Sequence, residues 1–267
     1  MNIKRVITLL WFDFYHSLFR LKGLAFLIPF GLFWYTLLWF LNEGGSEFLS
    51  SIEGLMLISK LTSLEVAQEL LVLHPPILSV FLLTALTFTP LFVILGANNQ
   101  LAADASSGSF RYLLSRCTRL EIFISRFLSA YFMIAMGIIF ACLASTLISL
   151  NNDNRELNET ITYALQSLSL VLLYTLPYVA FMSIISAFMS SALGTILMGA
   201  CAYVMTFVLI IYWHSDFPSI SYLLPNTFKD DLIGIARNDS VIAILGILAM
   251  TIIYLSIAWI IFRKRNL

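Results

Sequence analysis

The sequence predicts an all-α integral membrane protein with six transmembrane helices. Of its 267 residues, 60% are hydrophobic and only 11% are charged. A soluble domain carries roughly 45–50% apolar and about 25% charged residues. A soluble core of this length cannot bury such an excess of apolar side chains, so we expect lipid to be the solvent for most of the chain.

Six stretches are long and apolar enough to cross the hydrocarbon core, which takes about 20 residues of helix. They are 23–41, 77–97, 127–150, 161–188, 192–213 and 241–262. Pro29, Pro90 and Pro177 lie inside spans, where neighbouring helices can satisfy the freed carbonyls. We expect a kink at each proline and treat residues 1–267 as a single transmembrane domain.

Three segments outside the spans are candidate surface helices. Residues 1–22 carry an imperfect apolar stripe interrupted by Asp13, which predicts an N-terminal interfacial amphipathic helix rather than a cleaved signal peptide. Scattered leucines predict another interfacial helix between 42 and 76. A short, moderately apolar run between 212 and 240 predicts a re-entrant or surface helix before the last span.

The basic residues predict the orientation. Eleven of the fifteen lysines and arginines fall on the side that carries both termini, the 98–126 loop and the short turn at 189–191. Because positive residues remain inside, we expect both termini to be cytoplasmic. The acids have the opposite bias, with three on the inner side and twelve on the outer side.

The six spans contain no Asp, Glu, Lys, Arg or His. A proton relay, an intramembrane protease and an ion-coupled transporter all need such groups near the membrane midplane, so we expect no catalytic site in this chain. Among the remaining polar groups Gln166 is the strongest candidate for a role in a span, although most such groups bind neighbouring helices. His16, His74 and His214 lie in separate segments and the three cysteines are widely spaced, so neither a metal site nor a disulfide is expected.

The chain contains no P-loop pattern, so it has no ATP site of that type of its own. Its formal net charge is zero, which gives no support for a nucleic-acid partner.

The loop at 98–126 has an ordered pattern that a loop serving only topology would not need. An acid precedes a Gly-Ser pair, an apolar pair follows, and a basic turn leads into the next span: Asp104, Gly108-Ser109, Leu113-Leu114, Thr118-Arg119 and Arg126. This segment resembles the first cytoplasmic loop of type-2 ABC exporter permeases. It departs from that pattern in having Asp104 for the usual Glu and Cys117 for the usual Pro. The likeness extends to the whole arrangement of N-terminal helix, six spans, long last loop and basic tail.

The resemblance implies the membrane-spanning permease subunit of an ATP-driven exporter in the bacterial cytoplasmic (inner) membrane. Two separate ABC ATPase subunits would hold the ATP and magnesium. A second copy of this permease, or a sister permease, would complete the translocation path as a dimer. The first and fifth spans would meet near the two-fold axis, where Gly194 and Gly199 would let helices approach closely; the same glycines would equally suit packing within one subunit.

The resemblance also implies that the 98–126 loop contains a coupling helix seated in a groove of the ATPase. Apolar side chains would bury in that groove, and basic side chains would set register and association rate. The residues expected at this contact are Asp104, Gly108, Phe110, Arg111, Leu113, Leu114, Arg116, Arg119 and Glu121.

Other functions are compatible with parts of the sequence. A non-transporting membrane scaffold, or an assembly or maturation factor with the same fold, is the main alternative. A membrane-embedded enzyme and a secondary transporter are disfavoured because the spans lack ionisable groups. The cargo is left open, and the twelve outer acids suit either a cationic cargo or a periplasmic partner protein.

Overall fold

The computed structural model describes residues 2–18, 21–45, 51, 54, 56, 70–71, 73–98, 100–102, 104, 108–152, 156–213, 218–233 and 240–265, and these residues contain no strand. The elements are α1 (Ile3–Leu18), α2 (Leu21–Phe40), η1 (Leu41–Gly45), α6 (Pro76–Gly96), α8 (Phe110–Leu114), α9 (Arg119–Asn152), α10 (Leu157–Phe188), α11 (Ala192–Trp213), η2 (Pro218–Leu223), η3 (Pro225–Phe228), α12 (Lys229–Ile233) and α13 (Ser240–Lys264).

Six of these helices are long and apolar enough to cross a membrane, which confirms the predicted fold class. They cover Gly23–Gly45, Pro76–Gly96, Arg119–Asn152, Leu157–Phe188, Ala192–Trp213 and Val241–Lys264. The third and fourth have 34 and 32 residues. At 1.5 Å per residue such helices are about 50 Å long, well beyond the roughly 30 Å hydrocarbon core. Both therefore continue outside the lipid, which is why they extend past the predicted spans.

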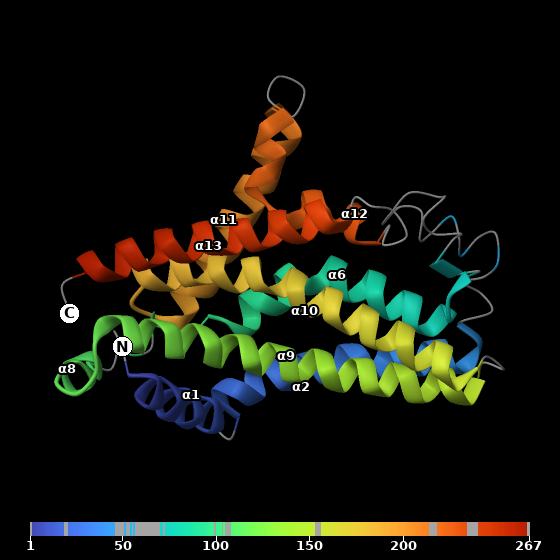
Figure 1. Cartoon of the computed structure of the whole chain (residues 1–267), viewed down its shortest axis with the longest axis horizontal. Helices are drawn as coiled ribbons and strands as arrows, with labels where there is room; N and C mark the ends of the chain where they lie inside the picture. The colour runs from blue at the N-terminus through green and yellow to red at the C-terminus, as the bar shows by residue number, and fades with distance from the viewer. Residues whose placement is uncertain are drawn as a thin grey trace.

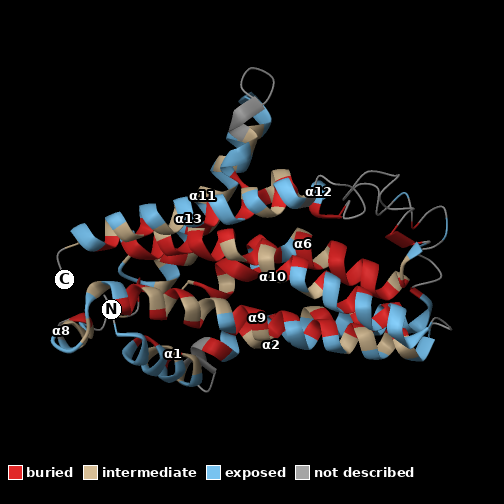
Figure 2. Ribbon diagram, viewed as in Figure 1, coloured by how far each residue is buried: buried red, intermediate tan, exposed pale blue. Residues whose placement is uncertain are grey.

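Helix α6 forms the centre of the bundle (Figures 1 and 2). It packs against α9 and α10, and α10 packs in turn along α13. Most residues of α6 are buried among these helices. Helix α2 covers one side through aromatic contacts, with the Phe30 ring 4.8 Å from Phe92 and the Trp34 ring 5.1 Å from Phe81.

The two ends of the bundle differ in charge. Both termini, α1 and α8 lie together at one end, which we call the terminal end (Figure 1). The basic side chains described there are Lys4, Arg5, Arg116, Arg119, Arg126, Arg263, Lys264 and Arg265. Away from this end the described charged residues are Lys229 and the acids Glu43, Glu156, Glu159, Asp230 and Asp231, and the Lys229 amine contacts Thr87 in the middle of α6. The fold thus keeps apart the charges on which the orientation prediction rests, while the side of the membrane that each end faces stays a prediction.

Helix α11 projects away from the other long helices (Figure 1) and is largely exposed (Figure 2). Its buried residues are Thr195 and Gly199. A Cβ at position 199 would lie 2.8 Å from the Sδ atom of Met182 on α10, so this glycine serves a close approach within one chain. The dimer contact that we predict at this position therefore has no support from Gly199, and it stays a prediction for the exposed face of α11.

The chain returns to the bundle through η2, η3 and α12, where a re-entrant or surface helix was expected. The segment is three short helical turns rather than one helix, and it buries Leu224, Phe228 and Leu232. Gly246 on α13 makes room for the Phe228 ring, because a Cβ there would clash with it. The interfacial helix predicted between 42 and 76 lies largely outside the described residues.

Candidate coupling site at the terminal end

Helix α8 stands at the tip of the terminal end, where a coupling helix was predicted (Figure 1). Gly108 turns the chain into it with φ of 67°, a left-handed conformation that favours glycine. Tyr112 is 81% exposed and Arg116 is exposed, whereas Leu113 and Leu114 are half-buried. The surface offered to a partner here is therefore centred on Tyr112 of α8 and on Arg116, which follows that helix. The side chain of Arg111 lies outside the described residues.

Phe110 does not face outward, which corrects the prediction that its ring sits in a groove of a partner. The ring is 2% exposed and lies 5.6 Å from Phe262 near the end of α13. It belongs to a small apolar cluster with Ile122 and Phe123 of α9, against which Leu113 and Leu114 also pack. Phe110 thus joins α8 to the long helices. Its ring is already removed from water inside the chain, so it has no apolar area left to bury in a partner's groove.

Helix α9 begins at a capping box that the sequence analysis treats as loop. The backbone N–H of Thr118 donates to Glu121 Oε2 at 2.9 Å, and the Glu121 N–H donates to Thr118 Oγ1 at 3.4 Å. This reciprocal pair is the usual way in which a Thr-x-x-Glu sequence starts a helix. Glu121 Oε1 also accepts from the backbone N–H of Asn2 at 2.7 Å. Glu121 is 2% exposed, so it fixes the start of α1 to α9 rather than facing a partner.

Arginines at this end close the ends of helices. Arg119 Nη1 donates to the carbonyl of Arg263, in the last turn of α13, at 2.7 Å, and to the carbonyl of Arg265, just after that helix, at 3.0 Å. Arg265 Nη1 donates to Ala187 O at 2.8 Å and to Met189 O at 3.1 Å, at the end of α10. Cations are favourable at helix C-termini, whose last carbonyls lack partners within the helix. Arg119 thus has a contact inside the chain, and its role in docking stays a prediction.

Arg126 joins two carboxylates from separate segments. It forms an ion pair with Asp13 of α1, and its Nη2 lies 2.6 Å from Asp104 Oδ2. The Ser109 hydroxyl donates to Asp104 Oδ1 at 2.9 Å, just before α8. Arg126 therefore links α1, the approach to α8, and α9. All three acids counted on the inner side are thus held by contacts inside the chain: Asp13 and Asp104 pair with Arg126, and Glu121 accepts hydrogen bonds from backbone N–H groups.

The segment before α8 is also attached to α10. Ser183 donates to Gln100 Oε1 at 2.6 Å, and Gln100 Nε2 donates to Val179 O at 3.3 Å. The Ser186 hydroxyl accepts from the backbone N–H of Leu101 at 2.8 Å. A movement of the segment before α8 must therefore either move α10 or break these buried hydrogen bonds, and leaving such groups unpaired is costly.

A second polar cluster lies deeper in the bundle and was missed by the sequence analysis. Tyr174 and Tyr178 of α10 donate to Asn226 Oδ1 at 2.9 and 2.6 Å, and Asn226 Nδ2 donates to the Tyr203 hydroxyl of α11 at 3.1 Å. Counting tyrosine among the polar residues of the spans would have identified three of its members. Gln166, the predicted polar candidate, is exposed on the outer face of α10.

Lys229, the first residue of α12, is close to Asn226 in sequence, and its side chain reaches α6. Its Nζ atom donates to Thr87 Oγ1 at 2.8 Å. Burial lowers the pKa of this amine, and the neighbouring Asp230 opposes the shift. Lys229 and Asn226 therefore hold the returning segment to three different long helices.

The fold and these sites define a multi-pass helical membrane protein with a braced terminal end. The sequence pattern of one family, described as "Protein of unknown function (DUF2705)", matches residues 76–267, which is more than half of the chain. The chain belongs to this family. No curated protein matches the chain. The family description names neither an activity nor a partner, so the ABC exporter resemblance enters below as a proposal.

Proposed function

We propose that this chain is the permease subunit of an ATP-driven ABC exporter, with α8 as its coupling helix. The observation that carries the proposal is the way in which α8 is held. It presents Tyr112 outward, with the exposed Arg116 just after its last residue, while Phe110 packs against α9 and α13. A short helix that is exposed on one side and rigidly joined to the spans on the other is suited to pass a displacement from a partner to the membrane helices.

The energy source in this proposal is a separate ATPase that binds at the cytoplasmic end. Tyr112 supplies a large, amphipathic contact and Arg116 a charge that steers association, and both residue types are common at the centre of interfaces. Gly108, Leu113 and Leu114 complete the expected contact. Asp104, Phe110, Arg119 and Glu121 act behind it, by bracing α8 against the bundle.

The path for the cargo is proposed to form between two copies of the permease or a copy and a sister subunit. An apolar groove of about 510 Å³ lies between α2 and α9 and is lined by Trp34, Tyr35 and Trp39. A groove of this size and polarity accepts a lipid chain or another apolar molecule. We therefore place an amphipathic or apolar cargo first.

The test is co-purification with an ABC ATPase subunit from the same organism. Wild type, Tyr112→Ala and Arg116→Glu are solubilised in mild detergent with the ATPase and captured through a tag. Lys264→Glu, an exposed basic residue of α13 at the same end, is the matched charge control. The proposal expects stoichiometric ATPase with wild type and control, and a loss of at least tenfold with the two α8 variants.

Two results would overturn the proposal: no ATPase with wild type, or equal capture by the α8 variants. Either result would bring the scaffold or assembly-factor function forward. Size-exclusion profiles of all four proteins show that each is folded, so that loss of capture reports on the surface of α8.

A further inference from the structure

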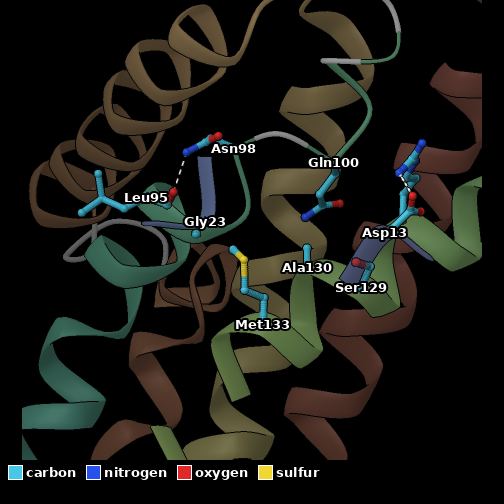
Figure 3. Close-up of a pocket in the computed structure, with 10 residues that line it drawn as sticks. Asp13, Gly23, Leu95, Asn98, Gln100, Ser129, Ala130 and Met133 are labelled. Carbon is cyan, nitrogen blue, oxygen red and sulfur yellow. Dashed lines mark hydrogen bonds and ion pairs between the residues drawn. The ribbon is translucent and has the colours of Figure 1, made fainter. Parts of the chain in front are cut away.

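Helix α1 packs against α9 and leaves a broad face uncovered at the terminal end (Figure 2). Val6 and Asp13, which are seven residues apart and therefore share one side of the helix, are buried. The Asp13 carboxylate lies on the inner side, where it lines a small polar cavity with Gln100 and Ser129 (Figure 3). The exposed side chains of α1, which form the uncovered face, are Ile3, Lys4, Arg5, Ile7, Thr8, Trp11, Phe12 and Tyr15.

Basic and aromatic side chains are interleaved on the uncovered face. Lys4 shares one side of the helix with Trp11, and Arg5 shares one with Phe12, because residues seven apart are separated by about two turns. Tyr15 lies one turn beyond Trp11. Long basic side chains and aromatic rings are the residues that occupy the boundary between lipid headgroups and acyl chains. The uncovered face therefore has the composition of a helix that lies at a membrane surface.

The contacts of α1 place it at the level of such a boundary. The backbone N–H of Asn2 donates to Glu121, and the Asp13 carboxylate pairs with Arg126. Both partners belong to the first turns of α9, directly before the span predicted to begin at residue 127. Because α1 lies beside the segment in which α9 enters that span, its uncovered face is positioned to meet lipid headgroups.

The basic charges of α1 are not paired with acids. Neither Lys4 nor Arg5 forms an ion pair with a residue that the structure describes. Arg5 Nη1 donates instead to the uncharged carbonyl of Arg116 at 3.1 Å. The pKa of Glu121 is lowered mainly by its hydrogen bond from the Asn2 N–H, and Arg5 makes only a smaller contribution. The positive charges of Lys4 and Arg5 are therefore available to a partner.

The uncovered face of α1 carries no acid. Asp13 is the one acid among residues 1–22, and it is buried in its ion pair with Arg126. Arg116, Arg263 and Lys264 add exposed positive charge at the same end. A surface of this sign attracts an anionic partner, and the interleaved aromatic rings favour a lipid surface over a soluble acidic protein.

We propose that the uncovered face of α1 binds the headgroups of anionic phospholipids. Lys4 and Arg5 contact the lipid phosphates, and the rings of Trp11, Phe12 and Tyr15 lie at the boundary with the acyl chains. This preference for lipid charge is additional to the interfacial position predicted from the sequence. It does not depend on the ATPase proposal, since it concerns the chain alone and is tested without a partner.

Bound lipid would also stabilise the terminal end. Helix α1 is attached to α9 through the ion pair of Asp13 with Arg126, and Arg126 continues to Asp104 before α8. A ligand that binds α1 in this arrangement, and not in the unfolded chain, raises the free energy of unfolding. The unfolding midpoint therefore reports on lipid binding.

The experiment titrates the purified full chain in mild detergent with phosphatidylglycerol or with phosphatidylcholine of the same acyl chains. We expect phosphatidylglycerol to raise the unfolding midpoint of wild type saturably, and phosphatidylcholine to need at least about fivefold more lipid for the same rise. Lys4→Gln should weaken the apparent affinity for phosphatidylglycerol about fivefold, because it removes one charge at the lipid surface. Lys4→Arg should keep the affinity of wild type.

Matched variants separate the uncovered face from the rest of the chain. Lys264→Gln removes an exposed positive charge of α13 at the same end and should weaken the affinity less than about twofold. Trp11→Ala should weaken it about threefold or more, whereas Trp213→Ala, an exposed tryptophan at the last residue of α11, should leave it unchanged.

Three results would overturn the proposal: no response of wild type, an equal response to both lipids, or equal losses in Lys4→Gln and Lys264→Gln. An equal response leaves α1 as an interfacial helix without a preference for lipid charge. Equal losses assign the effect to the overall charge of the terminal end. Because Lys4, Trp11 and Lys264 are exposed, size-exclusion profiles are expected to show that each variant is folded.

Discussion

Replacing Arg126 by Met tests how much the terminal end depends on its shared guanidinium. The change removes the ion pairs of Asp13 and Asp104, whose side chains are only 6% and 13% exposed. Loss of one member of a buried ion pair costs about 3–5 kcal/mol. We expect Arg126→Met to lose that much stability at pH 7, measured as a fall of roughly 10 °C in the unfolding midpoint in mild detergent.

The loss of stability caused by Arg126→Met has an upper limit that depends on pH. Each carboxyl can escape its penalty by taking up a proton, and one pH unit is worth about 1.4 kcal/mol. At pH 5 the carboxyl of Asp13, with a pKa of about 6, is already largely protonated in the wild type, so little is lost there when its ion pair is removed. The loss caused by Arg126→Met should therefore shrink to about 2 kcal/mol or less at pH 5.

Two further variants make the argument refutable. Arg116→Met removes an exposed arginine from the same end and should cost less than about 0.5 kcal/mol. The triple variant Asp13→Asn/Asp104→Asn/Arg126→Met replaces the charged groups by neutral ones and should regain most of the lost stability. If Arg126→Met behaves like Arg116→Met, or if its cost is the same at pH 5 and pH 7, the buried ion pairs do not carry the stability assigned to them.

Three other predictions follow from single contacts. The pKa of Asp13 is raised from 3.8 to about 6, so its contribution to stability is fully present below pH 3.8 and is lost as the pH rises through 6. In pH-dependent melts, the stability of wild type relative to Asp13→Asn should therefore fall by about 3 kcal/mol over that window. Gly199→Val should cost about 1–3 kcal/mol through its clash with α10, whereas Gly31→Val, which meets no atom within 4 Å, should cost less than half as much in the same melts. Glu121→Gln should cost about 1–2 kcal/mol by weakening the capping box and the contact to α1. Glu156 is exposed and its side chain makes no capping bond, so Glu156→Gln should leave the midpoint unchanged. Equal effects of the two variants would contradict the capping role.

The spans were predictable because the hydrophobic effect acts on the composition of a segment. The limits 161–188 and 192–213 needed no knowledge of tertiary contacts, and the observed helices end at Phe188 and run over Ala192–Trp213. The start of α9 was also readable, since Thr118 and Glu121 have the spacing of a capping box. It was missed because Thr118 was interpreted as part of a basic turn and Glu121 as part of the contact with an ATPase.

The polar contacts were not predictable, because each joins residues far apart in the chain. Nothing near Tyr178 indicates that its hydroxyl meets Asn226, 48 residues later. Likewise Phe110 has the same local pattern whether it packs inside the chain or in a partner. Only the position of the end of α13, which brings Phe262 to it, decides between the two.

The arginines that close the helix ends have a consequence for local unfolding. Arg119 belongs to the first turn of α9 and caps α13, Arg265 follows α13 and caps α10, and Arg5 of α1 donates to Arg116 O just after α8 at 3.1 Å. The end of each capped helix is thus closed by a residue of another element, and unwinding of one last turn releases the guanidinium that protects the next. Fraying at this end should accordingly be cooperative, and the amide protons in the final turns of α10 and α13 should exchange with solvent at similar rates. The charges that are expected to direct insertion into the membrane would then also keep these helix ends from opening one at a time.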